Sequence, residues 1–339
     1  MADPIVIWGA GAIGGTLGAY WARAGHDVLL VDIVKEHVEA CRTTGLTIFG
    51  PIEEFTQVIP AMTPEELTGS YSRIVLAVKA QATSVALPML APHLKPDGFV
   101  LSAQNGLNEI EIAEAVGAER TMGCFVNFSA DWHAPGRILF GSRSAVVVGE
   151  IDGSIRDRTR AMHALLREFE PDAVLTDDIW GYLWGKMSYG AMLFGTALNH
   201  DSMSANFADP ARLPAWLALG REVVAVALAR GVTPRGFGEY DPMVFAPGRP
   251  DADARPVIDW LRDFNAKSAK THSGIWRDLA VRKRRTEAAA QLLIVPKLAE
   301  QLGIPTPALS AVGRLIADIE EGRREQSPET FAALLKALP

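Results

Sequence analysis

Short apolar segments alternate with helical patterns along the first third of the chain. Uninterrupted apolar runs with the length of fully buried strands occur at Ile5–Trp8, Val28–Val31, Ile74–Val78 and Phe99–Leu101. Between the first two runs, apolar residues recur at the helical spacing i, i+4, i+7 and i+8: Ile13, Leu17, Tyr20 and Trp21. This alternation of strand and helix predicts a parallel, doubly wound sheet.

The pattern changes after residue 120. Three shorter apolar segments, separated by Pro-Gly and Gly-Ser turns, predict further strands at Met122–Val126, Arg137–Phe140 and Ala145–Val148. Beyond residue 153, apolar residues follow a helical period, which predicts helices at Ile155–Glu170, Ile179–Asn199, Arg212–Ala229, Val257–Ser268, Glu287–Leu302 and Pro307–Glu321. A stretch rich in Pro, Gly and Asp between Gly231 and Arg255 predicts a long loop.

These patterns predict an α/β fold with two domains. An N-terminal Rossmann-like dinucleotide-binding domain is expected over residues 1–176, and an all-helical domain for substrate binding and dimerisation over residues 177–339. The length of 339 residues also favours two domains over one. No internal repeat is evident.

Composition and charge exclude several classes of protein. Hydrophobic residues make up 48% and charged residues 22%, which excludes wholesale disorder, and the net charge of −7 argues against a nucleic-acid partner. The cysteines Cys41 and Cys124 form neither a disulfide framework nor a metal motif. The chain has no signal-peptide pattern and no apolar run of about 20 residues. We therefore expect a cytoplasmic protein with no membrane partner and no metal.

A glycine-rich segment, Gly9-Ala10-Gly11-Ala12-Ile13-Gly14, follows the first strand and opens the first helix. In this context Gly9 allows a tight turn, Gly11 allows the backbone to approach a pyrophosphate, and Gly14 allows close packing of helix against strand. The N–H groups of Ala12 and Ile13 begin the helix, and its positive dipole end favours phosphate groups. The segment predicts a dinucleotide site; a tight turn without a ligand is the alternative.

Asp32 closes the second predicted strand, 23 positions after Gly9. A carboxylate at this position accepts a hydrogen bond from the ribose 2′-hydroxyl and repels a 2′-phosphate. NAD is therefore the expected cofactor, and NADP remains possible because Lys35 is close in sequence. The glycine pattern alone also fits FAD.

Several separated motifs add to this picture. They are Val78-Lys79-Ala80, Gln104-Asn105-Gly106, Ser129-Ala130, Pro135-Gly136-Arg137-Ile138, Gly149-Glu150, Trp184-Gly185-Lys186 and Arg284-Arg285-Thr286-Glu287. Together with the glycine loop they resemble the ketopantoate reductase family over nearly the whole chain. That family reduces a 2-oxo acid by hydride transfer from a nicotinamide.

The resemblance implies that Lys186 is catalytic. A carbonyl that receives a hydride becomes an alkoxide, which needs a proton or a nearby positive charge, and a lysine supplies both. Lys186 can also hold the substrate carboxylate; the alternative is a surface lysine on an amphipathic helix.

The resemblance assigns further binding residues. Asn105 would contact cofactor and substrate, while Lys79 and Ser129 would lie beside the cofactor; an Asn-Gly turn and a solvated lysine are the alternatives. Glu287 would act in catalysis by contacting the cofactor ribose or by fixing Lys186 electrostatically. Ser273 would bind the substrate, with a helix cap as the alternative.

The chain departs from the family pattern at positions that face the substrate. The family has asparagines one and two turns after the lysine, where this chain has Gly190 and Phe194, and Ala289 replaces a usual aspartate. Losing amide donors weakens recognition of a small polyhydroxylated acid. We therefore expect a substrate that is bulkier or more apolar than ketopantoate.

Other functions stay open at this point. The chain could be an authentic 2-dehydropantoate 2-reductase of pantothenate biosynthesis, or a non-catalytic NAD-sensing protein. A β-hydroxyacid dehydrogenase is disfavoured, because such enzymes usually have Asn where this chain has Gly190. The basic run Arg282-Lys283-Arg284-Arg285 is interpreted as a solvated helix face. A homodimer is expected from the apolar faces of the helical domain.

Overall fold

A computed structural model describes residues 3–267 and 270–338 of the chain. The chain forms two compact units, Met1–Ile179 and Trp180–Pro339. The sequence pattern places the boundary at residue 176.

An eight-stranded sheet forms the centre of the first unit, in the order β12-β11-β8-β7-β6-β1-β2-β5. Its strands are β1 (Ile5–Trp8), β2 (Val28–Val31), β5 (Ala61–Met62), β6 (Tyr71–Leu76), β7 (Leu94–Ser102), β8 (Thr121–Val126), β11 (Val146–Glu150) and β12 (Val174–Leu175). All neighbouring pairs are parallel except β11 with β8. The predicted doubly wound sheet is therefore confirmed.

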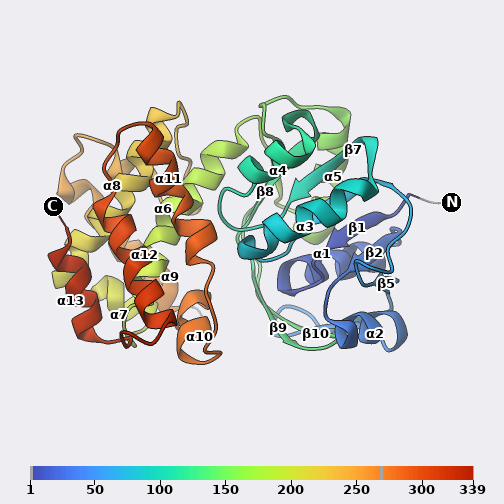
Figure 1. Ribbon diagram of the computed structural model, residues 1–339, viewed down its shortest axis with the longest axis horizontal. Helices are drawn as coiled ribbons and strands as arrows, with labels where there is room; N and C mark the ends of the chain where they lie inside the picture. The colour runs from blue at the N-terminus through green and yellow to red at the C-terminus, as the bar shows by residue number, and fades with distance from the viewer. Residues whose placement is uncertain (1–2, 268–269, 339) are drawn as a thin grey trace. The chain divides into compact units, whose positions relative to one another are not determined.

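Successive residues of the central strands supply two separate cores, because side chains alternate between the faces of a sheet. Ile5 and Ile7 of β1 pack in one core with α1 (Ala12–Arg23) and α5 (Asp157–Phe169). Val6 and Trp8 pack in the other with α3 (Thr83–Leu90) and α4 (Glu109–Val116). Figure 1 shows α3 and α4 together on one side of this sheet. Burial on both faces explains why these strands are continuous apolar runs.

A second, four-stranded sheet in the same unit is missing from the sequence prediction. Its order is β4-β3-β10-β9, with strands β3 (Leu46–Phe49), β4 (Phe55–Gln57), β9 (Ser129–Ala134) and β10 (Arg137–Ser142). No residue of β4 or β9 is fully buried, so these strands lack the apolar signal of the central sheet. Helix α2 (Lys35–Thr43) follows β2.

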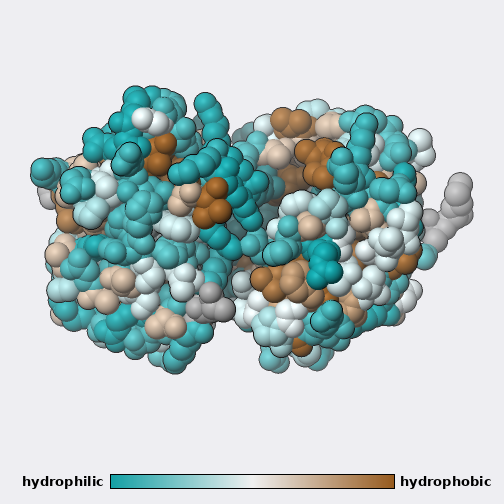
Figure 2. Space-filling model, turned by 90° about the horizontal axis from the view of Figure 1, so that it is seen from below, coloured by the Kyte–Doolittle hydropathy of each residue, from teal (hydrophilic) through white to brown (hydrophobic). Residues whose placement is uncertain are grey.

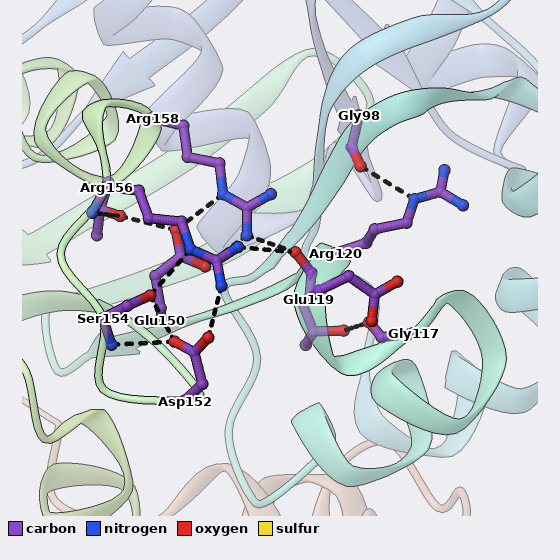
Figure 3. Close-up of polar contacts among 11 residues, drawn as sticks. Gly98, Gly117, Glu119, Arg120, Glu150, Asp152, Ser154, Arg156 and Arg158 are labelled. Carbon is purple, nitrogen blue, oxygen red and sulfur yellow. Dashed lines mark hydrogen bonds and ion pairs between the residues drawn. The ribbon is translucent and has the colours of Figure 1, made fainter.

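A buried ion pair joins the end of β11 to α5 (Figure 3). Arg158 donates two hydrogen bonds to the Glu150 carboxylate, at 2.8 and 2.6 Å, and Thr159 donates a third at 2.7 Å. Arg158 also donates to the Glu119 carbonyl oxygen. Glu150 is 1% exposed, so its charge depends on these partners.

The second unit is helical, as predicted. Its α-helices are α6 (Ile179–Thr196, which begins at the last residue of the first unit), α7 (Met203–Ala208), α8 (Leu213–Ala229), α9 (Asp251–Ala266), α10 (Gly274–Ala280), α11 (Ile294–Gln301), α12 (Pro307–Glu320) and α13 (Pro328–Lys336). Short 3-10 helices occur across both units at Ala80–Ala82, Ala91–His93, Ala118–Arg120, Pro210–Arg212 and Pro242–Phe245. Figure 1 shows α8, α11 and α12 clustered in this unit.

The predicted loop between Gly231 and Arg255 is wrong in part. It contains the 3-10 helix Pro242–Phe245, and α9 begins at Asp251, six residues before the predicted start at Val257. The prediction rested on the Pro-, Gly- and Asp-rich composition, but Asp251 and Asp253 lie in the first turn, where carboxylates stabilise a helix N-terminus, and α9 continues through Pro256. The predicted end, Ser268, lies outside the described residues.

The single helix predicted over Glu287–Leu302 is also wrong. A π-helix spans Ala288–Leu292, and α11 begins separately at Ile294. A continuous helix would place Pro296 in its interior, where proline removes a backbone hydrogen bond. The restart at Ile294 places Pro296 in a first turn, where that N–H is not needed.

The surface shown in Figure 2 is mostly hydrophilic, with hydrophobic residues in separate patches. Ile33, Val85 and Val281 are more than half exposed. Scattered apolar residues are ordinary for a folded surface. Within residues 3–267 and 270–338, no helix is both long and apolar enough to cross a membrane.

Candidate functional site

The predicted cofactor residues of the first unit lie at one edge of its large sheet. Each follows the carboxyl end of a parallel strand: Gly9 after β1, Asp32 after β2, Lys79 after β6, Asn105 after β7 and Ser129 after β8. In open α/β sheets, ligands bind outside this edge. The topology therefore brings to one edge residues that are far apart in the sequence.

The glycine loop has space for a ligand where the motif predicts it. Gly9 has φ +98°, and a Cβ on it would lie 2.7 Å from the Val78 nitrogen. A Cβ on Gly14 would overlap the Gly9 carbonyl oxygen, so this position needs glycine for packing. A Cβ on Gly11, the N-cap of α1, would meet no atom within 4 Å beyond its chain neighbours. The backbone at Gly11 is thus open to an approaching pyrophosphate, beside the N–H groups that begin α1 at Ala12.

Backbone hydrogen bonds orient the Asp32 carboxylate toward this loop. One oxygen accepts the Ala10 N–H at 2.9 Å, and the other accepts the Val34 N–H at 2.9 Å. A carboxylate has about four acceptor positions, so these two bonds leave capacity for ribose hydroxyls. The residues present fit a dinucleotide cofactor.

The His37 side chain supports the glycine loop through a hydrogen bond to its backbone, and the sequence analysis did not predict this residue. Its Nδ1 accepts the Gly136 N–H at 2.9 Å, and its Nε2 donates to the Ala10 carbonyl oxygen at 2.8 Å. His37 is 1% exposed and joins the glycine loop to the turn between β9 and β10. The sequence feature that indicates its burial is the helical spacing of four residues to the buried Cys41 on the inner face of α2.

The segment after β7 combines an exposed amide with buried polar groups. Asn105 is exposed, and its carbonyl oxygen accepts a bond from Asn108 at 2.7 Å. Gln104 is buried and donates to the Val78 carbonyl oxygen at 2.9 Å and to Thr83 at 2.8 Å. Gln104 thereby fixes the segment after β6, where Lys79 is exposed, against the segment after β7.

Glu109, the first residue of α4, is a second group that the sequence reasoning missed. It is 0% exposed, and neither carboxyl oxygen makes a hydrogen bond of normal geometry to the described residues. Burial raises the pKa of this carboxyl to about 7, against smaller lowering by its own backbone N–H and the Ser102 hydroxyl. No sequence motif marks it.

Lys186 lies in the middle of α6 and is partly buried. The preceding turn packs against the chain at Arg235: the Arg235 N–H donates to the Gly181 carbonyl oxygen at 2.7 Å, and a Cβ on Gly185 would overlap the Arg235 carbonyl. The absence of a side chain at Gly185 allows this approach. The helix turn that carries Lys186 is thereby fixed within the second unit.

One turn after Lys186 the structure leaves room. A Cβ on Gly190 would meet only the Met187 Cε within 4 Å, at 3.8 Å. Phe194, two turns after Lys186, is 1% exposed and belongs to the core. Of the two departures from the family pattern after Lys186, Gly190 leaves open space, whereas Phe194 is part of the buried core.

Ser273 is the N-cap of α10 and is 3% exposed. Its Oγ accepts the Trp276 N–H at 3.2 Å, and a capping hydroxyl still carries a proton to donate. Beside it, the His272 ring stacks on Trp276 with centroids 3.9 Å apart.

The basic run after α10 is a loop and not the helix face that we expected. The buried Asp278 carboxylate accepts hydrogen bonds from Arg282 at 3.2 Å and Arg284 at 2.9 Å. These contacts fold the run around one carboxylate. Glu287 follows the loop and accepts a hydrogen bond from the Gln291 side chain.

Cys41 and Cys124 are free thiols. Both are buried, and burial raises the pKa of the Cys41 thiol to about 12. Across the described part of the chain, no three His, Cys, Asp or Glu side chains are grouped to hold a metal ion.

Comparison with known proteins agrees with this fold. The family model for ketopantoate reductase PanE/ApbA matches residues 5–153, and the model for its C-terminal domain matches residues 178–320. A 2-dehydropantoate 2-reductase from Mesorhizobium japonicum is 28% identical over 67% of this chain and 77% of its own. One from Streptococcus pyogenes serotype M3 is 25% identical over 92% of this chain and 96% of its own.

A solved structure of D-mandelate dehydrogenase with NADH and anilino(oxo)acetate has the same fold, with a TM-score of 0.80 at 20% identity, covering 94% of this chain and 99% of that one. Fold and family together define an NAD(P)-dependent oxidoreductase that acts on CH–OH or C=O groups. The chain belongs to the ketopantoate reductase family.

Proposed function

We propose that this protein transfers hydride between a nicotinamide cofactor and C2 of a 2-hydroxy or 2-oxo acid whose side chain is bulkier or more apolar than that of ketopantoate. The observation that carries the proposal is the open space at Gly190, one turn after Lys186. The D-mandelate dehydrogenase of the same fold, named for an aromatic 2-hydroxy acid, is consistent with such a substrate.

The first unit holds the cofactor. The backbone from Gly9 to Gly14 receives the pyrophosphate, and Asp32 accepts the ribose hydroxyls, which favours NAD over NADP. Lys79, Asn105 and Ser129, at the neighbouring strand ends, lie beside the rest of the cofactor. When bound, the nicotinamide supplies or accepts the hydride.

Lys186 performs the proton chemistry. In the reductive direction its ammonium group polarises the C2 carbonyl, stabilises negative charge on the oxygen and donates a proton to it. In the oxidative direction the neutral amine accepts the hydroxyl proton. Glu287 contacts the cofactor ribose or fixes the charge of Lys186.

The substrate carboxylate and carbonyl are held by hydrogen-bond donors and one positive charge. Asn105 and Ser273 donate hydrogen bonds to the carboxylate and carbonyl, and Lys186 adds a positive charge. The substrate side chain occupies the space at Gly190, where the family's asparagine would otherwise donate a hydrogen bond.

A substrate panel tests this proposal through the absorbance of NADH. We expect 2-oxo acids with branched or aromatic side chains to be reduced with a higher kcat/KM than ketopantoate. Gly190→Asn fills the space and restores an amide, so it should shift the kcat/KM ratio toward ketopantoate by about tenfold. Gly231→Asn, at an exposed and open glycine of the second unit whose positive φ asparagine tolerates, is the control for adding a side chain.

Two results would contradict the proposal. Efficient, saturable reduction of ketopantoate by the wild type, with no preference for larger acids, would identify an authentic 2-dehydropantoate 2-reductase. NADH binding without hydride transfer to any acid of the panel would favour an NAD-sensing protein.

A further inference from the structure

Thr286, the residue before Glu287, is held by a carboxylate from a distant helix. Its backbone N–H and its hydroxyl both donate to the same Glu320 oxygen, at 2.7 Å each. The Thr286 Oγ also accepts the Ala288 N–H at 3.1 Å, so the hydroxyl both donates and accepts a hydrogen bond. Thr286 is 5% exposed, which makes these bonds hard to replace with water.

The position of Glu320 is unfavourable for helix α12 itself. Glu320 is the last residue of that helix, where the negative end of the helix dipole disfavours a carboxylate. Helix preference therefore does not explain why a glutamate occupies position 320. The two hydrogen bonds that its carboxylate accepts from Thr286 do explain it.

The other side of Glu287 is equally constrained. Glu287 is the N-cap of the π-helix Ala288–Leu292, and its carbonyl oxygen accepts the Gln291 N–H at 2.8 Å. The Gln291 side chain, 8% exposed, donates to the Glu287 carboxylate. π-Helical turns are rare and frequently occur at functional sites.

Helix α12 also supports the far end of the π-helix. A Cβ on Gly313 of α12 would overlap the end of the Leu293 side chain, so glycine at this position allows the close contact. Helix α12 therefore contacts the segment from Thr286 to Leu293 at both ends. The N-terminus of α12 is capped separately, because the Glu222 carboxylate accepts the Ala308 and Leu309 N–H groups at 2.8 Å each.

We infer that Glu320 and Thr286 are positioning residues that fix the Glu287 carboxylate for its part in the reaction. This rests on the role proposed above for Glu287. Glu320 anchors the backbone before Glu287, and Gln291 holds the carboxylate itself. The rigid carboxylate loses little freedom when cofactor binds, which is why its supports matter for function.

The test compares Glu287→Gln, Thr286→Val and Glu320→Ala by two readouts. NADH affinity is measured by fluorescence titration, and kcat and KM are measured with the best 2-oxo acid of the panel. We expect both support variants to change the same parameter as Glu287→Gln, by about tenfold. Thr286→Ser keeps the hydroxyl and should restore wild-type values.

Glu222→Gln is the matched control, because it weakens the opposite end of α12 without touching Thr286. It should lower thermal stability and leave NADH affinity and KM unchanged. Combining Thr286→Val with Glu287→Gln should add little to Glu287→Gln alone, since the support acts only through Glu287.

Different outcomes separate the two levels of inference. If Glu287→Gln impairs binding or turnover while Thr286→Val and Glu320→Ala do not, the positioning role is wrong and the proposed function stands. If Glu222→Gln produces the same kinetic defect, the effect is general destabilisation and the inference is overturned. If Glu287→Gln leaves NADH affinity, kcat and KM unchanged in an active enzyme, Glu287 has no role in the reaction. The positioning roles of Thr286 and Glu320 are then overturned as well.

Discussion

At the scale of single residues, the three glycines of the loop after β1 have three different environments. Gly9, Gly11 and Gly14 are predictable because the motif encodes a backbone geometry, and the structure shows a positive φ, open space and close packing at those three positions. Glu109 is not predictable, because its burial comes from the packing of α4 against β7 and β8, and His37 is marked only by its helical spacing to Cys41. A lone glutamate in the first turn of a helix indicates only an exposed carboxylate.

Glu109 makes stability depend on pH. Its native pKa of about 7 lies above the ordinary 4.5, so the unfolded chain releases this proton at lower pH than the native one. Between these values stability falls as pH rises, by about 3 kcal/mol in total for a shift of this size. Glu109→Gln removes the titration, so we expect it to be more stable than the wild type near pH 8, with a smaller difference near pH 5.

Thermal unfolding of both proteins at several pH values checks this expectation. Glu114→Gln, at an exposed position on the same helix, controls for the loss of a helical carboxylate. A stability difference between Glu109→Gln and the wild type that does not change with pH would contradict it.

At the scale of elements, apolar runs predict the central strands and most helices, because burial on known faces leaves a periodic signal. Strands β4 and β9 have no fully buried residue and give no such signal. The prediction of helix ends near prolines also fails: Pro256 lies inside α9, whereas α11 begins anew at Ile294, which places Pro296 in its first turn. Local sequence does not decide which proline a helix tolerates, since tertiary packing can offset one lost hydrogen bond.

The join between β11 and α5 yields a prediction about stability. Arg158→Met leaves the buried Glu150 carboxylate without its cation, and we expect a loss of about 3 kcal/mol in the free energy of unfolding. Arg156→Met, which removes the neighbouring ion pair between half-exposed Arg156 and Asp152, should cost less than about 1 kcal/mol. Figure 3 shows both arginines side by side.

Urea titration near neutral pH measures both losses. The double variant Arg158→Met with Glu150→Leu should recover most of the stability, because no unpaired charge remains buried. Equal losses in Arg158→Met and Arg156→Met would show that Glu150 does not depend on its partner.

At the scale of the whole molecule, the chain combines a dinucleotide-binding unit with a helical unit that carries Lys186, Ser273 and Glu287. The separate roles of the two units can be predicted from sequence, because each unit has its own motif and its own spacing of apolar residues. The substrate does not follow from sequence, since in the proposed function it depends on the space at Gly190 and on side chains from several helices. The departures from the family pattern identify the positions that would set substrate preference, and the acid itself is identified by the substrate panel.

The most direct test of this account compares the wild type with Lys186→Met in hydride transfer from NADH to the preferred 2-oxo acid. We expect turnover to fall by about 100-fold or more, the range for a lost general acid, while NADH affinity by fluorescence stays within about twofold. Turnover by Lys186→Met at the wild-type rate would contradict the central claim that Lys186 supplies the proton.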